Sequence, residues 1–123
     1  MSNATQLVDR YLAAWNETDS KRRRELVGET FVETATYRDP AQAGDGRNGI
    51  DAMIAAAQAR FPGLIFQRLG EPDAHNDSVR FRWSLGPTGA ESIVEGTDFA
   101  TIAGGRFATV NGFFDKLPAA AGT

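Results

Sequence analysis

Residues 91–115 read ESIVEGTDFATIAGGRFATVNGFFD, two strand-like runs on either side of Gly104-Gly105. A Gly-Gly pair between such runs predicts a tight β-hairpin, because glycine adopts the positive φ angles that two-residue hairpin turns need. The predicted strands cover residues 91–103 and 106–115. This hairpin indicates that the C-terminal part of the chain is an antiparallel sheet.

Two more strands are predicted directly upstream. Alternating apolar and polar residues indicate strands at 64–72 and 78–86, with turns at 75–77 and 87–90. Short turns between neighbouring strands predict a meander, and a long curved sheet needs helices to cover its concave side.

The N-terminal half is predicted to be mainly helical. Apolar residues spaced three and four apart predict helices at 5–18, at 20–28 and at 49–60, and a strand at 31–39 ends before Pro40 and a polar loop at 40–48. Helices followed by strands are typical of an α+β domain. We expect one domain over residues 1–123, with a flexible tail at 118–123 and a single apolar pocket between the helices and the sheet.

Composition excludes several classes of function. The 123 residues include no cysteine and a single histidine, so a disulfide framework, a thiolate nucleophile and the usual metal sites are not expected, and we expect no cofactor. The net charge of −3 argues against nucleic-acid binding, and the short basic run at 21–24 is interpreted as a solvated helix face. No signal peptide or membrane span is evident, so we expect a cytoplasmic protein.

Asp98 stands in the middle of a predicted strand, on the same face as Val94, Gly96 and Ala100. Aspartate is uncommon in strands, and a charge inside a sheet is costly unless it is paired or neutralised. Two interpretations stay open from the alternation alone. Asp98 either points outward and pairs with Arg82 on the neighbouring strand, or lines the pocket with a raised pKa.

Three other polar residues have ordinary structural interpretations. Asp39 precedes Pro40, and Asp-Pro commonly ends a strand. Tyr11 lies on the apolar stripe of the first helix, where a tyrosine is by default a core residue whose hydroxyl finds a partner. His75 falls in a predicted hairpin tip and is expected at the surface.

The order of elements and four segments together resemble the nuclear transport factor 2-like superfamily, also described as SnoaL-like. The segments are Arg-Tyr-Leu-Ala-Ala-Trp at 10–15, Tyr-Arg-Asp-Pro at 37–40, Gly-Arg-Asn-Gly-Ile at 46–50 and the closing run at 105–114. The resemblance implies an α+β cone with a pocket between helices and sheet, and a homodimer formed through the sheet. Apolar residues on both faces of the last two strands independently suggest that a second subunit covers the outer face.

The resemblance also implies a site similar to that of ketosteroid isomerases, which use an aspartate base and an oxyanion hole made of a tyrosine and a protonated aspartic acid. Residue by residue, Asp39 matches the base, Tyr11 the tyrosine and Asp98 the protonated acid, while Phe114 matches an aromatic residue of the pocket wall.

The hypothesis is therefore an isomerase or polyketide cyclase that moves a proton next to a carbonyl of a small hydrophobic ligand. The expected pocket walls are Trp15, Tyr37, Met53, Phe61, Phe81, Trp83, Val110 and Phe114. Two alternatives remain. One is a non-catalytic ligand-binding or dimeric interaction domain, since fold alone does not define function. The other is water activation similar to that of epoxide hydrolases, in which Arg82 would assist Asp98.

Overall fold

The computed structural model describes residues 3–118, so the predicted tail lies outside the described residues except for Pro118. Within these described residues, three helices and six strands follow each other. They are α1 (Asn3–Asn16), α2 (Ser20–Thr30), β1 (Phe31–Arg38), β2 (Ala43–Asp45), α3 (Gly46–Arg60), β3 (Ile65–His75), β4 (Ser78–Gly86), β5 (Val94–Ala103) and β6 (Arg106–Lys116). The three predicted helices and five predicted strands are present, with shifted ends.

The helices form where apolar spacing and capping predict them. In α1 the buried residues share one stripe, which includes Leu7, Tyr11 and Trp15. In α2 the Asp19 side chain caps the N-terminus by accepting a hydrogen bond from the Arg22 backbone N–H at 2.8 Å. The prediction that Gly28 ends this helix is wrong, because the helix continues to Thr30 and Val27 and Thr30 are buried in its last turn.

The six strands form one sheet in the order β2-β1-β6-β5-β4-β3. The prediction of an antiparallel sheet needs a correction, because β1 pairs with β6 in parallel and the other pairs are antiparallel. Strand β2 was not predicted, and the expected loop at 40–48 in fact contains β2 and the start of α3. A three-residue strand carries too little pattern to be recognised by alternation, whereas its partner β1 supplies the hydrogen bonds that form it.

The predicted turn between the last two strands is confirmed. Gly104 and Gly105 have φ angles of 58° and 79°, the left-handed values that a two-residue hairpin turn requires. Strand β3 runs past Pro72 to His75, and its register with β4 shifts between Leu69 and Asp73, so an irregularity accommodates the proline.

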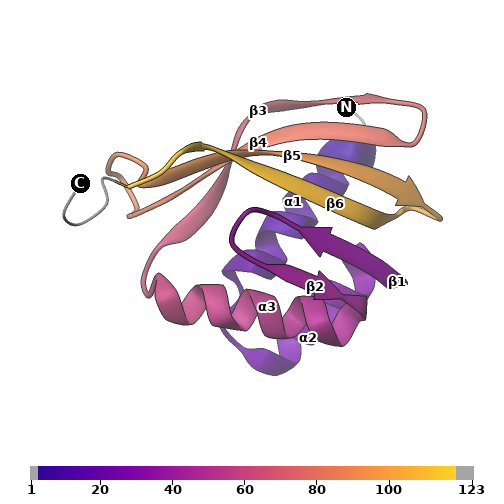
Figure 1. The fold of residues 1–123 in the computed structure, drawn as a ribbon, viewed down its shortest axis with the longest axis horizontal. Coiled ribbons are helices and arrows are strands. Elements are labelled where there is room, and N and C mark those ends of the chain that lie inside the picture. The colour runs from indigo at the N-terminus through magenta and orange to yellow at the C-terminus, as the bar shows by residue number, and fades with distance from the viewer. Residues whose placement is uncertain (1–2, 119–123) are drawn as a thin grey trace.

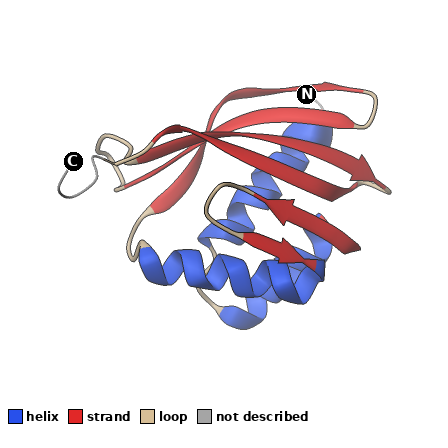
Figure 2. Cartoon of the chain, in the orientation of Figure 1, coloured by secondary structure: helices blue, strands red, loops and turns tan. Residues whose placement is uncertain are grey.

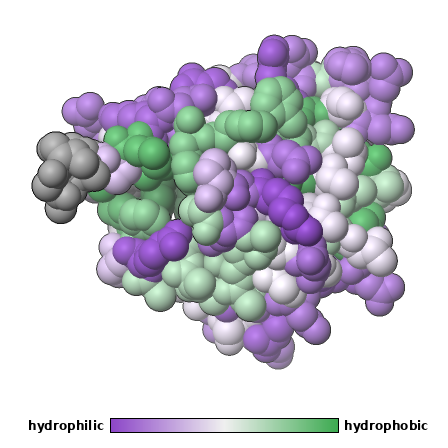
Figure 3. Space-filling model, in the orientation of Figure 1, coloured by the Kyte–Doolittle hydropathy of each residue, from purple (hydrophilic) through white to green (hydrophobic). Residues whose placement is uncertain are grey.

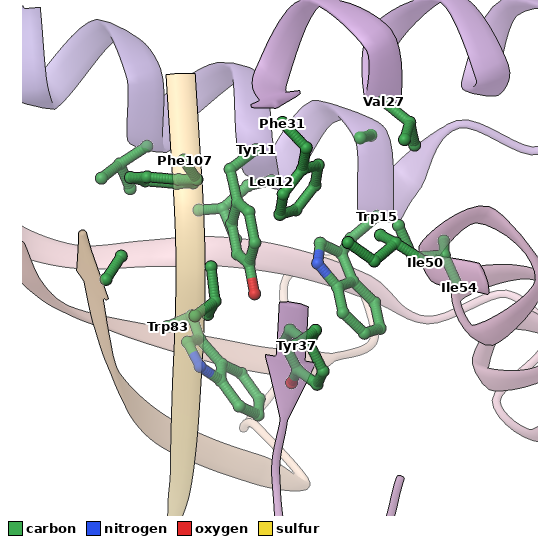
Figure 4. Close-up of a cluster of buried hydrophobic side chains, with 14 of the residues drawn as sticks. Tyr11, Leu12, Trp15, Val27, Phe31, Tyr37, Ile50, Ile54, Trp83 and Phe107 are labelled. Atoms are coloured by element: carbon green, nitrogen blue, oxygen red, sulfur yellow. The ribbon is translucent and has the colours of Figure 1, made fainter. Parts of the chain in front are cut away.

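All three helices lie on one side of the sheet (Figures 1 and 2). Helix α1 packs along β3, while α3 packs against β1 and β2. The buried hydrophobic side chains fill the space between the two layers, and Figure 4 shows a cluster of them. Within residues 3–118, no helix combines the length and apolar character needed to cross a membrane.

Candidate active site

A cavity of about 190 Å³ opens between the helices and the sheet. Its apolar walls come from α1, the C-terminal end of α3, strands β3 to β6 and the segment after β6. These wall residues include Leu12, Trp15, Ala57, Phe61, Phe66, Trp83, Leu85, Val94, Phe114 and Leu117. Hydrophobic residues also gather on the surface beside the C-terminal end of the described chain (Figure 3). The lining contains three charged residues, Asp39, Arg60 and Asp98.

Asp98 lies at the floor of this cavity and is 1% exposed. The Tyr11 hydroxyl donates a hydrogen bond to Asp98 Oδ2 at 2.8 Å, and the Trp83 Nε1–H donates to Oδ1 at 3.0 Å. Figure 4 shows the Tyr11 hydroxyl directed toward the space beside Trp83 and Tyr37. Both carboxyl oxygens of Asp98 thus accept a hydrogen bond, and no cation of residues 3–118 forms an ion pair with it.

Two glycines make room for this arrangement. Gly96 is the cross-strand partner of Trp83, and a Cβ atom on Gly96 would overlap the indole ring. Gly112 is the cross-strand partner of Asp98, and a Cβ atom there would lie 2.7 Å from Asp98 Oδ1 and 3.3 Å from Asp39 Cβ. The same point is 3.4 Å from the Tyr37 hydroxyl oxygen, so the two carboxylates and this phenol surround one position.

Asp39 follows β1 and is half-buried at the edge of the cavity. The Tyr37 hydroxyl donates to its Oδ2 at 2.6 Å, and the backbone N–H groups of Ala41 and Gln42 donate to its Oδ1 at 2.7 and 2.9 Å. These two N–H bonds close the turn that follows β1, as expected for an aspartate before proline. Asp39 therefore lines the cavity and holds its own turn at the same time.

Burial changes the acidity of the groups at the cavity floor. It raises the pKa of Asp98 to about 6; the Trp83 and Tyr11 hydrogen bonds oppose this rise, and the negative charge of Asp39 adds to it. Burial, followed by the nearby Asp98 charge, also raises the pKa of Tyr11 and of Tyr37 well above the usual value for a phenol. Both phenols therefore stay protonated at neutral pH and can act as hydrogen-bond donors.

The structure brings together Tyr11, Asp39 and Asp98, which the resemblance selected, at one cavity. Five of the expected wall residues also line it, namely Trp15, Tyr37, Phe61, Trp83 and Phe114. The expectation for Met53, Phe81 and Val110 is wrong, because these residues are buried in the core and do not line the cavity. The Phe81 ring, for example, is buried among other aromatic rings and packs 5.2 Å from Tyr11 and 6.0 Å from Phe107, centroid to centroid.

Sequence reasoning missed three polar groups of the site, the Trp83 indole N–H, Arg60 and Gln42. It treated Trp83 as an apolar wall, whereas its indole N–H is a donor to Asp98. It also missed Arg60, which is the last residue of α3 and lines the cavity. The cross-strand position of Gly96 opposite Trp83 was a possible signal for the first, since a glycine inside a strand often marks a close approach of another group.

The alternative partner of Asp98 is excluded by the geometry. Arg82 lies on the opposite face of the sheet and pairs with Glu95 at 3.4 Å and with Asp115 at 3.7 Å. His75 is exposed at its hairpin, as expected, with its Nδ1 at 3.0 Å from the Asn76 amide nitrogen. Within residues 3–118, no group of three or more His, Asp or Glu side chains is arranged to hold a metal ion.

The fold and the site together define an α+β domain with a cavity between its helices and its sheet. Comparisons with known proteins identify its family. The SnoaL-like domain model matches residues 8–110, so this chain belongs to the SnoaL-like family. A proposed SnoaL-like isomerase from Agrobacterium tumefaciens is 42% identical, with a TM-score of 0.88 and coverage of 94% of this chain and 99% of that one. Comparison with curated proteins gives no match.

More distant structures share the fold alone. A proposed polyketide cyclase from Sinorhizobium meliloti is 23% identical, with a TM-score of 0.68 over 87% of this chain and 93% of that one. A proposed ketosteroid isomerase from Kribbella flavida is 16% identical, with a TM-score of 0.69 over 96% of this chain and 82% of that one.

Proposed function

We propose that this protein is an enzyme that transfers a proton next to a carbonyl group of a small hydrophobic ligand, as an isomerase or a cyclase does. The observation that carries the proposal is the Asp98 carboxyl, buried at the floor of an apolar cavity between two hydrogen-bond donors. A titrating group in such a position is a candidate for acid–base chemistry. The SnoaL-like relative named as a proposed isomerase supports the same class of reaction.

In this proposal Asp98 takes the proton. A pKa of about 6 leaves the carboxyl mostly ionised at neutral pH yet basic enough to accept a proton from the carbon beside a carbonyl. As the proton moves to Asp98, negative charge moves to the carbonyl oxygen of the ligand. The Tyr11 hydroxyl, released by the neutral carboxyl, can then donate to that oxygen, and Asp98 returns the proton to a different carbon.

The proposal gives Asp39 a different role from the base that the resemblance implies. Its two oxygens already accept three hydrogen bonds, two of which close its own turn. Its negative charge contributes to the raised pKa of Asp98. Asp39 is therefore proposed as a positioning residue that keeps Asp98 basic.

The test is the conversion of a β,γ-unsaturated cyclohexenone to its conjugated isomer, followed by absorbance, together with exchange of the α-protons for deuterium, followed by NMR. For the wild type, kcat/KM is expected to rise with pH through about 6 and then level off, because Asp98 must be ionised. Asp98→Asn keeps the shape of the side chain and should lower kcat/KM by about 100-fold or more.

The control variant is Asp39→Asn, which separates positioning from proton transfer. It should keep activity within about tenfold of the wild type and lower the midpoint of the pH profile, because removal of a negative charge eases ionisation of Asp98. If Asp39→Asn removes the activity while Asp98→Asn keeps it, the roles are reversed. If the wild type binds cyclic ketones but neither isomerises them nor exchanges their protons, the non-catalytic alternative replaces this proposal.

The epoxide-hydrolase alternative receives no support from the contacts of Asp98. That chemistry needs an arginine beside the carboxylate, and Arg82 is occupied by Glu95 and Asp115 on the outer face.

A further inference from the structure

The cavity is small for a member of a class that includes steroid enzymes. Its volume is about 190 Å³. An apolar protein cavity of about 150 Å³ holds one benzene molecule. The enclosed part of the site therefore suits one flat ring or two fused rings, and a longer ligand would extend out through the mouth.

A single positive charge stands at that mouth. Asp98 at the floor is almost fully buried, whereas Arg60 is exposed, so the two residues mark the inner and outer ends of the same cavity. The Arg60 guanidinium carbon lies 5.7 Å from the centroid of the Phe61 ring, another lining residue. This contact keeps the charged group over the cavity wall.

Arg60 has no acidic partner within residues 3–118, whereas most arginines of this chain do. Arg23 pairs with Asp51 at 2.8 Å and Arg68 with Asp9 at 2.8 Å. In the described part of the chain, Arg10, Arg24, Arg47 and Arg106 also lack an acidic partner, but none of them lines the cavity; Arg10 and Arg47 instead donate to the backbone carbonyls of Glu29 and Phe31. The position of Arg60 in the last turn of α3 is favourable by itself, because a cation there interacts with the helix dipole.

We propose that the ligand of this cavity is a one- or two-ring carbonyl compound that carries an anionic group, such as a carboxylate, which pairs with Arg60. The requirement for a carbonyl rests on the proposed proton transfer; the requirements for small size and negative charge do not. The charges of the cavity support this orientation. The two carboxylates, Asp39 and Asp98, repel an anionic group from the floor, and Arg60 attracts it at the mouth.

The test compares two probes of the same shape, chromone-2-carboxylate and its neutral carboxamide, by isothermal titration calorimetry at neutral pH. The wild type is expected to bind the carboxylate about fivefold more tightly at low salt, the upper end for a solvent-exposed ion pair, and added salt should reduce the difference. The chain has two tryptophans, Trp15 and Trp83, and both line the cavity, so quenching of tryptophan fluorescence shows that the probe binds there.

Substitutions of arginine identify the residue that causes the preference for the carboxylate probe. Arg60→Gln should remove the preference for the carboxylate, and Arg60→Lys should restore part of it. Arg24→Gln and Arg106→Gln are the matched controls and should keep the full preference. Thermal unfolding of each variant separates a ligand contact from a helix-end effect, because loss of the helix-dipole interaction changes stability without changing the ratio of the two affinities.

Equal affinity of the wild type for both probes, or an unchanged ratio in Arg60→Gln, would overturn the proposal. So would a failure of both probes to bind at millimolar concentration, or tighter binding of a neutral four-ring steroid. Asp98→Asn distinguishes this proposal from the proposed catalysis, because it should lower kcat/KM by about 100-fold or more while the carboxylate probe still binds more tightly than the carboxamide. If the carboxylate preference is not observed, the proposed proton transfer is unaffected, and if proton transfer is not observed, the proposed pairing with Arg60 is unaffected.

Discussion

Asp98 shows how a carboxyl can be buried without a cation. Two hydrogen bonds from Tyr11 and Trp83 stabilise its ionised form, and desolvation destabilises that form more strongly. The result is a pKa that lies above the usual value of 3.8, at about 6. An ionised carboxyl in this position lowers the free energy of unfolding at neutral pH. Destabilising groups of this kind are common at sites where a protein needs a reactive group.

This cost gives a prediction for stability as a function of pH. The folded protein holds the Asp98 proton more tightly than the unfolded chain, so the contribution of Asp98 to folding is fully present below 3.8 and is lost as the pH rises through about 6. The free energy of unfolding of the wild type, minus that of Asp98→Asn, should therefore fall by about 2 kcal/mol between pH about 4 and about 7.5. Urea unfolding at several pH values measures it.

The control for this measurement is Asp73→Asn, which removes an exposed carboxyl on the other face of the sheet. Its difference from the wild type should change much less over the same pH range. A difference between the wild type and Asp98→Asn that stays constant with pH would contradict the raised pKa.

At the scale of elements, the pairing of β4 with β5 builds the site. This register places Gly96 opposite Trp83 and leaves the indole free to lie over the strand and reach Asp98. The pairing of β5 with β6 then places Gly112 opposite Asp98. Two positions without side chains, on adjacent strands, thus create the space that the buried polar groups occupy.

Gly96→Ala tests this role. The added methyl group would overlap the Trp83 ring and lie 2.7 Å from the Phe113 carbonyl oxygen, so the indole must move away from Asp98. We expect a loss of about 1–3 kcal/mol in the free energy of unfolding, measured with urea, and a changed near-UV circular dichroism signal.

Gly28→Ala is the matched control, because no atom lies within 4 Å of the added Cβ position and Gly28 is inside α2. It should raise stability by about 0.5–1 kcal/mol, as alanine favours helix over glycine. If the two substitutions changed the free energy of unfolding equally, the effect at Gly96 would reflect backbone conformation alone and not contact with the Trp83 ring.

At the scale of the whole molecule, the outer face of the sheet carries two exposed aromatic side chains. Phe99 on β5 is 46% exposed and Phe113 on β6 is 55% exposed. Their rings pack edge to face with centroids 5.8 Å apart, beside charged pairs such as Arg80 with Asp73. We propose that a second copy of the chain covers this face, which would form the homodimer that the sequence suggests.

The prediction is a dimer of the 13.3 kDa chain that Phe113→Ser weakens. Loss of a central aromatic anchor should raise the dissociation constant by about tenfold or more, measured by sedimentation equilibrium. Phe113→Leu keeps an apolar side chain and should have a smaller effect. A wild type that stays monomeric at every concentration tested would contradict the proposal.

The sequence predicted much of the fold because the relevant signals are local. Strand alternation over 78–86 correctly indicated the inward face of β4, and the Gly-Gly turn predicted the last hairpin, whereas alternation left the face of β5, and so the direction of Asp98, open. What it could not give was the parallel contact between β1 and β6 or the short strand β2. The parallel contact joins segments far apart in the chain, and local pattern carries no information about such pairs. Strand β2 lies close to β1 in the sequence, but its three residues are too few to show an alternation.

The same division holds for the site. By itself the sequence determined which residues share a strand or helix face, and for β4 it also determined which face points toward the core. Only the tertiary structure decided that Trp83 rather than Arg82 reaches Asp98, that Met53, Phe81 and Val110 are covered by other residues, and that Arg60 stands at the mouth. The physical reason is that a face is set by the repeat of the backbone, whereas a cavity is the space left after side chains from every element have packed.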